Sequence, residues 1–502
     1  MQKSRITISV IFFFLLGYVG KAQDTTQLKL SLSHFAAPGI SMYELRNESL
    51  IREKNFSFFP FTMEKYYIPW EHQEHPITAI AELGLTEIIP WSFTKFIRHW
   101  DNPADNWADV GFRSWWNNLN YGWEYDGDNF LTNYFAHPYH GSVYFNAGRA
   151  NGYDFLESAA WSFAGSTLWE LFGEVYRPSI NDWVNTSVNG IALGEITYRL
   201  ATYITDNTAT GSKRTWQEIA GALINPVRGL SRLMSGEVSR TFENPEWRVP
   251  NEFYVLLNTG FRQIDRHGDR GDQIISEGVQ EGFLDVDVYY TNGFGRDLNV
   301  PFSSFTLSAS IASGAPNLTL LSATGNLYGW RLKKNSLSTH ILNISLDYLY
   351  FNHIRTIYGG TSIAPRFISS FQLKKNLNLN AILGLNIVLM GATPNDYFLA
   401  DDGRNYDFGP GIGHYIGATL KNGVWDLVSF YYRGEWIWTR SEPSGSKHHL
   451  HTLWLDAQYP ITTYLAIGIG GGVYLRESFY DAFDDVKNRM PIARIFIKTA
   501  LF

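Results

Sequence analysis

The chain has no cysteine among its 502 residues. Disulfide bonds and thiolate chemistry are therefore excluded. After the first 22 residues the sequence also lacks an uncharged run of about twenty apolar residues, the length that a membrane-spanning helix requires. Any passage through a membrane would therefore have to use strands.

Positive charge is in deficit as well. The chain has 41 Lys and Arg against 48 Asp and Glu, a formal net charge of −7. This balance argues against nucleic acid as a partner. The glycines Gly141, Gly148 and Gly152 do not follow a strand and open a helix as a phosphate-binding loop does, so nucleotide binding is not expected and no cofactor is predicted.

Aromatic residues, in contrast, are abundant, and the second half of the chain alternates between apolar and polar residues. A strand between lipid and a barrel lumen sends apolar side chains outward and polar ones inward with a period of two. Apolar positions of this kind are Leu342, Ile344, Leu346, Tyr348 and Tyr350, then Leu377, Leu379, Ala381, Leu383 and Leu385, then Val428, Phe430, Tyr432 and Trp436. The polar positions between them include Asn343, Ser345, Asp347, Asn378, Asn380, Ser429, Arg433 and Glu435. About twelve such segments favour a closed antiparallel barrel over a soluble sandwich.

The links between these segments are predicted to alternate between tight and long, as in outer-membrane barrels. Tight links are predicted at Gly295–Asn299, Lys333–Ser336, Lys374–Asn376, Asn422–Gly423 and Pro460–Thr462. Long loops are predicted at Asp265–Glu281, His353–Gly360, Gly391–Pro410, Ser441–His448 and Glu477–Asn488. If the long loops face outward, both ends of the barrel are periplasmic.

Four regions are predicted along the chain. Residues 1–22 read as a signal peptide, with Lys3 and Arg5, an apolar core, and a small-x-small cleavage site before Gln23. Residues 23–129 are aromatic and rich in proline, and we expect periplasmic loops and short helices there. Residues 130–240 form a helical module, and residues 250–502 form the barrel.

The helical module is predicted to contain three helices. The first spans Asp154–Glu174, and the second runs from Ile180 to about Tyr203 behind the capping residues Ser179 and Asp182. The third begins after Thr215 and runs to about Met234, with a kink at Pro226. A polar stripe on the first helix contains Ser158, Ser162, Ser166, Glu170 and Glu174.

Several blocks of this module resemble a known bacterial family. They are Asn133–Ser142, Ala147–Gly152, Gly165–Glu170, Ser179–Asp182, Gly190 and Gly194-Glu195. In this order they resemble the bacterial domain-of-unknown-function family 3943, over about Trp116 to Thr205. The family has no assigned activity, so the resemblance implies an envelope location and a single polar unit rather than a reaction.

The polar residues of the module allow more than one chemistry. His137 and His140 could bind zinc or iron together with Glu170, Glu174 or Glu195, although no metal is predicted; alternatively, both histidines cap helix ends and bind buried carboxylates. Glu170 and Glu174 could act as acid and base, or be held by Arg149 and Asn side chains.

Two further sets complete the predicted site. The polar network is expected to comprise Arg149, Asn151, Ser166, Glu170, Glu174, Asn181, Asp182 and Glu195. Gly190 and Gly194 are expected to permit close packing of helices. A nucleophile at Ser142 or Ser166 beside His140 is a third reading of the same region.

We therefore predict an outer-membrane barrel of about twelve strands whose helical module lies in the lumen or at its periplasmic mouth, meeting inward-facing groups such as Asp285, Asp287, Arg433 and Glu435. A barrel of this size is expected to need such a plug, because strand side chains alone would not fill it. The expected function is a plugged or gated barrel for transport or envelope structure. The alternatives are a lipid- or glycan-modifying enzyme centred on His137, His140, Glu170 and Glu174, and a scaffold for an envelope protein. Expected partners are outer-membrane lipid and the barrel-insertion machinery; the solute is not identified.

Overall fold

The computed structural model describes residues 67–98, 106–270, 273–292, 298–314, 316–335, 337–353, 356–397, 404–441 and 445–501. The predicted signal peptide and the aromatic segment before residue 67 lie outside the described residues. All elements discussed below belong to one compact unit, Pro69–Phe502.

Twelve antiparallel strands close into a barrel in which each strand pairs with its neighbour in sequence and β1 pairs with β12. The strands are β1 (Glu252–Arg270), β2 (Gln273–Thr291), β3 (Phe305–Ala312), β4 (Leu318–Lys334), β5 (Ser338–His353), β6 (Thr356–Lys374), β7 (Leu377–Pro394), β8 (Tyr406–Asn422), β9 (Trp425–Trp438), β10 (Lys447–Pro460), β11 (Leu465–Phe479) and β12 (Val486–Leu501). The predicted fold class, a barrel of about twelve strands with a helical module before it, is confirmed.

The predicted alternation of loop lengths is wrong in three places. β1 continues to Arg270 and β2 begins at Gln273, so the long loop predicted at Asp265–Glu281 is strand. β5 and β6 are likewise separated only by residues 354–355, whereas the link from Thr291 to Phe305 is long. Gly and Asp residues that favour turns are accommodated in strands here because the two strands of each hairpin pair with each other up to its end.

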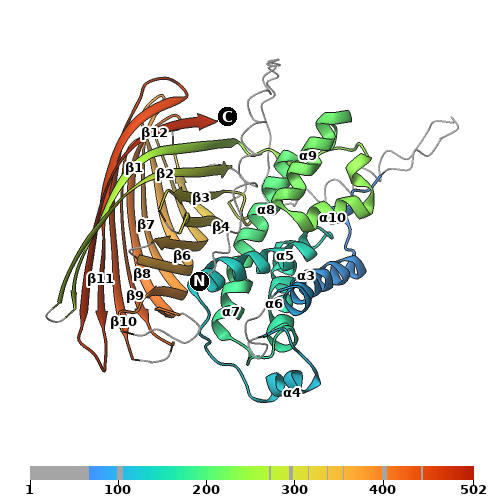
Figure 1. Ribbon diagram of the computed structural model, residues 1–502. Coiled ribbons are helices and arrows are strands. Elements are labelled where there is room, and N and C mark those ends of the chain that lie inside the picture. The colour runs from blue at the N-terminus through green and yellow to red at the C-terminus, as the bar shows by residue number, and fades with distance from the viewer. Residues whose placement is uncertain are drawn as a thin grey trace. The chain divides into compact units, whose positions relative to one another are not determined.

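The helices precede the barrel in sequence (Figure 1). They are α3 (Pro76–Phe96), α4 (Phe112–Asn120), α5 (His137–Arg149), α6 (Phe155–Leu168), α7 (Ile180–Val184), α8 (Gly190–Ile204), α9 (Gly211–Ile224) and α10 (Pro226–Ser235). Single π-helical turns, η4 (Thr132–Ala136), η5 (Trp169–Gly173) and η6 (Asn185–Asn189), adjoin α5, α6 and α8. None of the described helices is both long and apolar enough to cross a membrane.

The three predicted helices are present with adjusted ends. Asp154 caps α6, which continues through η5, and Ser179 caps α7 by accepting a hydrogen bond from the backbone N–H of Asp182. The third helix is two: α9 ends at Ile224 and α10 begins at Pro226, because proline lacks the N–H that would continue α9.

The two faces of the barrel wall can be told apart by contacts across the lumen. Phe351 on β5 stacks on Tyr474 of β11, with ring centroids 5.5 Å apart, although these strands are far from each other in the sheet. Residues of β5 in step with Phe351, such as Asp347, therefore point inward. Tyr348 and Tyr350 point outward.

The helical module packs on these outward-facing residues. Tyr348 donates a hydrogen bond of 2.5 Å to the carbonyl of Tyr134 in η4, and Thr361 of β6 donates one of 2.6 Å to Asn189 of η6. The shared apolar core contains Phe130, Tyr134, Phe145, Ile191 and Ile196 from the module, and Tyr290, Phe305, Leu346, Tyr348, Tyr350, Met390, Tyr406 and Phe408 from β2 to β8. The predicted position of the module, in the lumen or across its mouth, is therefore wrong: it covers one outer side of the barrel wall.

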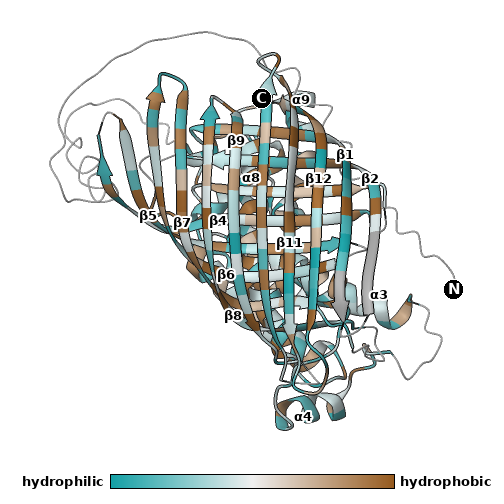
Figure 2. Cartoon of the chain, turned by 90° about the vertical axis from the view of Figure 1, so that its left-hand side faces the viewer, coloured by the Kyte–Doolittle hydropathy of each residue, from teal (hydrophilic) through white to brown (hydrophobic). Residues whose placement is uncertain are grey.

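The remaining outer wall carries exposed apolar side chains. They include Leu383, Leu385, Ile412, Ile416, Phe430, Leu453, Leu455, Ile467, Ile469, Ile495 and Ile497. Figure 2 shows the corresponding alternation of hydrophobic and hydrophilic residues along β11, β12 and β1. The outward pattern predicted from sequence thus divides into a part that the module covers and a part that it leaves exposed.

Candidate functional site

The acidic centre of the helical module, defined as Asp126, Asp128, Glu170, Glu174 and Asp182, surrounds His137. Capping places its members: Ser179 holds the first turn of α7, which carries Asp182, and the backbone N–H of Ser179 donates a 2.7 Å hydrogen bond to Glu170 Oε2. Asn181 Nδ2 donates to both Asp126 and Asp182. Three segments of chain thus bring their carboxyl groups to one place.

His137 lies between two of these carboxylates. Its Nε2 is 3.5 Å from Asp182 Oδ2 and 3.7 Å from Asp128 Oδ2, and its Nδ1 is 3.2 Å from Thr186 Oγ1. Burial lowers the pKa of His137, but Asp128, Glu170 and Asp126 outweigh burial and raise it above the usual value. An imidazolium is therefore stabilised here.

The pKa values of Glu170, Glu174 and Asp182 lie above those of carboxyl groups on a protein surface. Burial raises the pKa of Glu170 to about 8, with Asp126 and Asp128 adding to the shift and His137 opposing it. Burial and Glu170 raise the pKa of Glu174, and burial and Asp126 raise that of Asp182. Like charges that share a dry site cannot all ionise.

His140 belongs to a separate neighbourhood on α5. Its Nε2 is 3.0 Å from the carbonyl of Thr86 and 2.9 Å from Tyr144 Oη, and Tyr144 donates to Glu87 Oε2 at 2.9 Å. Burial lowers the pKa of His140 to about 4, so this imidazole is neutral. His137 and His140 do not converge on one ligand position, and among the described residues neither Ser142 nor Ser166 binds His140.

One interpretation of the sequence predicts that Arg149 binds Glu170 and Glu174. In the structure Arg149 binds Glu195 instead. Its Nε binds Glu195 Oε2 at 3.0 Å, and Arg199 Nε binds Glu195 Oε1 at 2.8 Å. Asn151 lies in a third group, where it and Ser231 donate to Glu82, whose pKa burial raises to about 7. The polar positions predicted as one network are divided among three.

The glycines lie where helices meet. A Cβ at Gly190 would be 2.4 Å from the backbone of Gly141 on α5, and one at Gly194 would be 2.6 Å from Phe145. Ser162 on α6 donates to the carbonyls of Gly141 and Ser187 at the same crossing. Close approach of α5, α6 and α8 therefore depends on the absence of side chains here.

Sequence reasoning missed Asp126, Asp128, Glu82, Glu87 and Tyr144. The Asp-Gly-Asp stretch at 126–128 lies just before the blocks that carry the family resemblance, and this was the available signal. Glu82 and Glu87 belong to α3, whose pattern is apolar on every side and does not indicate which face is buried.

The lumen is filled by side chains of the strands themselves, contrary to prediction. Arg494 pairs with Asp285 at 3.1 Å and with Asp456 at 2.6 Å, and Lys421 on β8 donates to Tyr254 on β1 at 2.6 Å. The other inward groups named above also find partners on strands: Asp287 with Asn258 and Ser308, Arg433 with Glu435, and Glu435 with Asn386.

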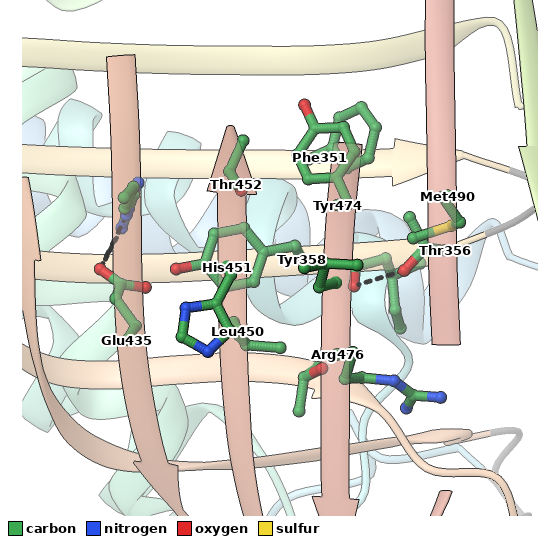
Figure 3. A pocket seen from close by; sticks show the side chains of 14 residues that line it. Phe351, Thr356, Tyr358, Glu435, Leu450, His451, Thr452, Tyr474, Arg476 and Met490 are labelled. Carbon is green, nitrogen blue, oxygen red and sulfur yellow. Dashed lines mark hydrogen bonds and ion pairs between the residues drawn. The ribbon is translucent and has the colours of Figure 1, made fainter. Parts of the chain in front are cut away.

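A small cavity lies within this packed lumen. It measures about 30 Å³, enough for a water molecule. Figure 3 shows Phe351, Tyr358, Glu435, Tyr474 and Arg476 around it.

Comparison with solved structures returns barrels at low similarity. The chain is similar to the NanC porin, with 13% identity, a TM-score of 0.23, and coverage of 47% of this chain and 98% of that one. For the toluene transporter TodX of Pseudomonas putida the values are 8%, 0.22, 51% and 90%. For an anion-selective porin from Comamonas acidovorans they are 8%, 0.19, 50% and 100%.

No curated protein matches the chain. The match that bears on the helical module is to a family model. Residues 122–227 match the family described as Domain of unknown function (DUF3943), so the resemblance predicted from the module's sequence blocks is confirmed.

Proposed function

We propose that the protein is an outer-membrane barrel that is closed at rest by its own inward-facing side chains and opens to pass a solute. The observation that carries the proposal is the packed lumen, in which Phe351 contacts Tyr474 from across the barrel and Arg494 bridges Asp285 and Asp456. An ion-pair network of this kind can rearrange when a ligand or a neighbouring charge competes for one partner. Exposed apolar residues on the outer wall support a location in lipid.

The position of the module on the outside of the barrel determines how the barrel could open. Helices on the outside of β2 to β8 do not block the lumen, so removal of a plug is not the opening step. Instead, the contacts of the module with these strands can favour one arrangement of the barrel wall over another. Asp347 and Tyr348 are neighbours on β5, the first paired with Arg366 inside the barrel and the second bound to the module outside.

Single-channel conductance in a planar bilayer tests the proposal. The full-length mature protein is expected to be closed, and Phe351→Ala with Tyr474→Ala is expected to conduct, because the pair that spans the lumen is removed. Leu455→Ala, a truncation on the exposed outer face, is the matched control and should stay closed. A wild-type protein with steady open channels, or a folded double variant that stays closed, would contradict the proposal.

An enzymatic role is the second candidate, and one observation favours it. Glu170 is buried with a pKa of about 8 beside His137, which is a setting suited to proton transfer near neutral pH. The candidate substrates are envelope lipids and glycans. Loss of a hydrolytic activity in Glu170→Gln, with the heat-modifiable barrel band retained on a gel, would support this role over the first.

A further inference from the structure

We propose that Asp128, His137 and Asp182 bind one divalent transition-metal ion, such as Zn²⁺ or Mn²⁺. One ligand atom from each residue lies within 4.8 Å of the others. Tetrahedral ligand atoms about 2.0–2.2 Å from a metal lie about 3.4 Å from one another. His137 Nε2 is already at a similar distance from Asp182 Oδ2 (3.5 Å) and from Asp128 Oδ2 (3.7 Å). One imidazole with two carboxylates is a donor set suited to these metals.

Two buried polar atoms of this region, His137 Nε2 and the Tyr134 hydroxyl, lack hydrogen-bond partners among the described residues. His137 Nε2 is inaccessible to solvent, has no hydrogen-bond partner among the described residues, and is directed at Asp128 and Asp182. The Tyr134 hydroxyl, on a side chain that is 1% exposed, has none either. Unpartnered buried polar atoms are costly and call for a ligand that the protein itself does not supply.

Charge gives a separate argument. The acidic centre holds five carboxyl groups, and no Lys or Arg among the described residues forms an ion pair with any of them. His137 is its only basic partner in the ion pairs of this part of the chain. Buried carboxylates are normally paired or coordinate a metal. A divalent cation beside His137 would coordinate the buried carboxylate of Asp182.

The site also has a route for entry and a structural consequence. The Asp128 side chain is 44% exposed, whereas that of Asp182 is 3% exposed, so an ion can reach the site from the side of Asp128. The carbonyl of Asp128 accepts a 2.9 Å hydrogen bond from Tyr406 of β8. A metal would therefore connect α5 and α7 to a segment that is already bound to the barrel.

The binding experiment uses the full mature chain purified in detergent without a polyhistidine tag and stripped with EDTA. Titration with Zn²⁺ by calorimetry, with metal counted by mass spectrometry, is expected to show one ion per chain. Asp182→Asn and His137→Gln are expected to weaken binding by at least about tenfold. His140→Gln, which removes a buried histidine of the same helix outside the set, is the matched control and should bind as the wild type does.

A spectroscopic readout separates ligation from a structural role. Co²⁺ bound at the site should give visible absorption that changes in His137→Gln but not in His140→Gln. If His137→Gln lacks the heat-modifiable barrel band, Asp128→Asn replaces it, since its exposed side chain tolerates the change. The proposal is overturned if the stripped protein takes up no Zn²⁺ or Mn²⁺, or if wild type and Asp182→Asn bind equally; a hydrogen-bonded imidazolium then explains the geometry.

Discussion

Thr361 on the outward face of β6 donates a 2.6 Å hydrogen bond to Asn189 Oδ1, in the π-helical turn before α8. Both residues are fully buried. A strand hydroxyl that a lipid-facing barrel would expose is thus used to dock a helix. The contact lies within the part of the wall, β2 to β8, that the module covers.

Thr361→Val should weaken this docking. The change keeps the shape of the side chain but leaves the Asn189 oxygen buried without a donor, which costs about 1–3 kcal/mol. The measurement is the temperature at which helical circular dichroism is lost in detergent. Ser362→Ala is the matched control: this neighbour faces the lumen, and its hydroxyl has no partner among the described residues, so the transition should not move. Equal shifts for both variants would contradict the assignment of faces.

Gly190→Ala should destabilise the helical module through overpacking. The new Cβ would be 2.4 Å from the Gly141 backbone, which cannot yield as a flexible side chain would. A cost of about 1–3 kcal/mol is expected. Gly84→Ala on α3 meets no atom within 4 Å and, by removing glycine from a helix, should stabilise slightly. The thermal unfolding temperatures of both variants test this prediction. A Gly190→Ala variant as stable as the wild type would show that α5 and α8 pack less closely than they do in the structure.

The stability of the module should fall as pH rises from about 4.5 to 8. Burial raises the pKa of Glu87 to about 8, so the folded state holds this proton more tightly than the unfolded state does, and stability is lost as the pH passes through that interval. The loss from this one group is on the order of 4 kcal/mol. Glu87→Gln should reduce the pH dependence in chemical denaturation series, with the remainder due to Glu82 and Glu170, whose pKa values are also raised, whereas Glu74→Gln, at an exposed position, should leave it unchanged.

His140 contributes with the opposite sign. Its pKa is lowered by burial to about 4, so the unfolded state binds the proton more readily, and stability is lost as pH falls from 6.5 toward 4. Between about pH 4.5 and 6.5 the effects of Glu87 and His140 on stability have opposite signs. Above pH 6.5 only the effect of Glu87 still changes with pH. His140→Gln should therefore show a decline with pH that begins nearer pH 4.5 than in the wild type. A wild-type profile that rises steadily to pH 8 would contradict the Glu87 assignment, and one that does not rise between pH 4 and 6.5 when Glu87 is replaced by Gln would contradict the His140 assignment.

The barrel could be predicted because its period of two is local. Alternation at Val428, Phe430 and Arg433 depends only on which face each residue has, so twelve strands and their inward polar groups follow from sequence. The sequence does not indicate whether lipid or the helical module covers the outward face. Tyr348 and Tyr350 are as compatible with lipid as with Phe130 and Tyr134, because both surroundings accept aromatic side chains.

The candidate site was partly predictable for the same reason. The polar stripe predicted for the helix Asp154–Glu174 correctly indicated that Glu170, which lies in η5, is buried among polar groups, since helical spacing shows which residues share a face. The partners of Glu170 come from other segments, and no spacing rule connects it with Asp126 or Asp128. Similarly, Arg149 is directed to Glu195 rather than to Glu170 by the crossing of α5 and α8 at Gly190.

Arg494→Met tests how far ion pairs hold the lumen closed. The change keeps much of the side-chain volume but leaves Asp285 and Asp456, with which Arg494 pairs at 3.1 and 2.6 Å, without their cation. Two carboxylates left unpaired in a packed interior should cost about 3–5 kcal/mol, so the barrel should unfold at a lower temperature in the heat-modifiability assay. Lys487→Met is the matched control, because its pair with Glu477 is exposed and contributes at most about 1 kcal/mol. If Arg494→Met is as stable as the control, the ion pairs do not hold the lumen closed. Aromatic contacts, chiefly that of Phe351 with Tyr474, would then close it, and the gate would be formed by these rings.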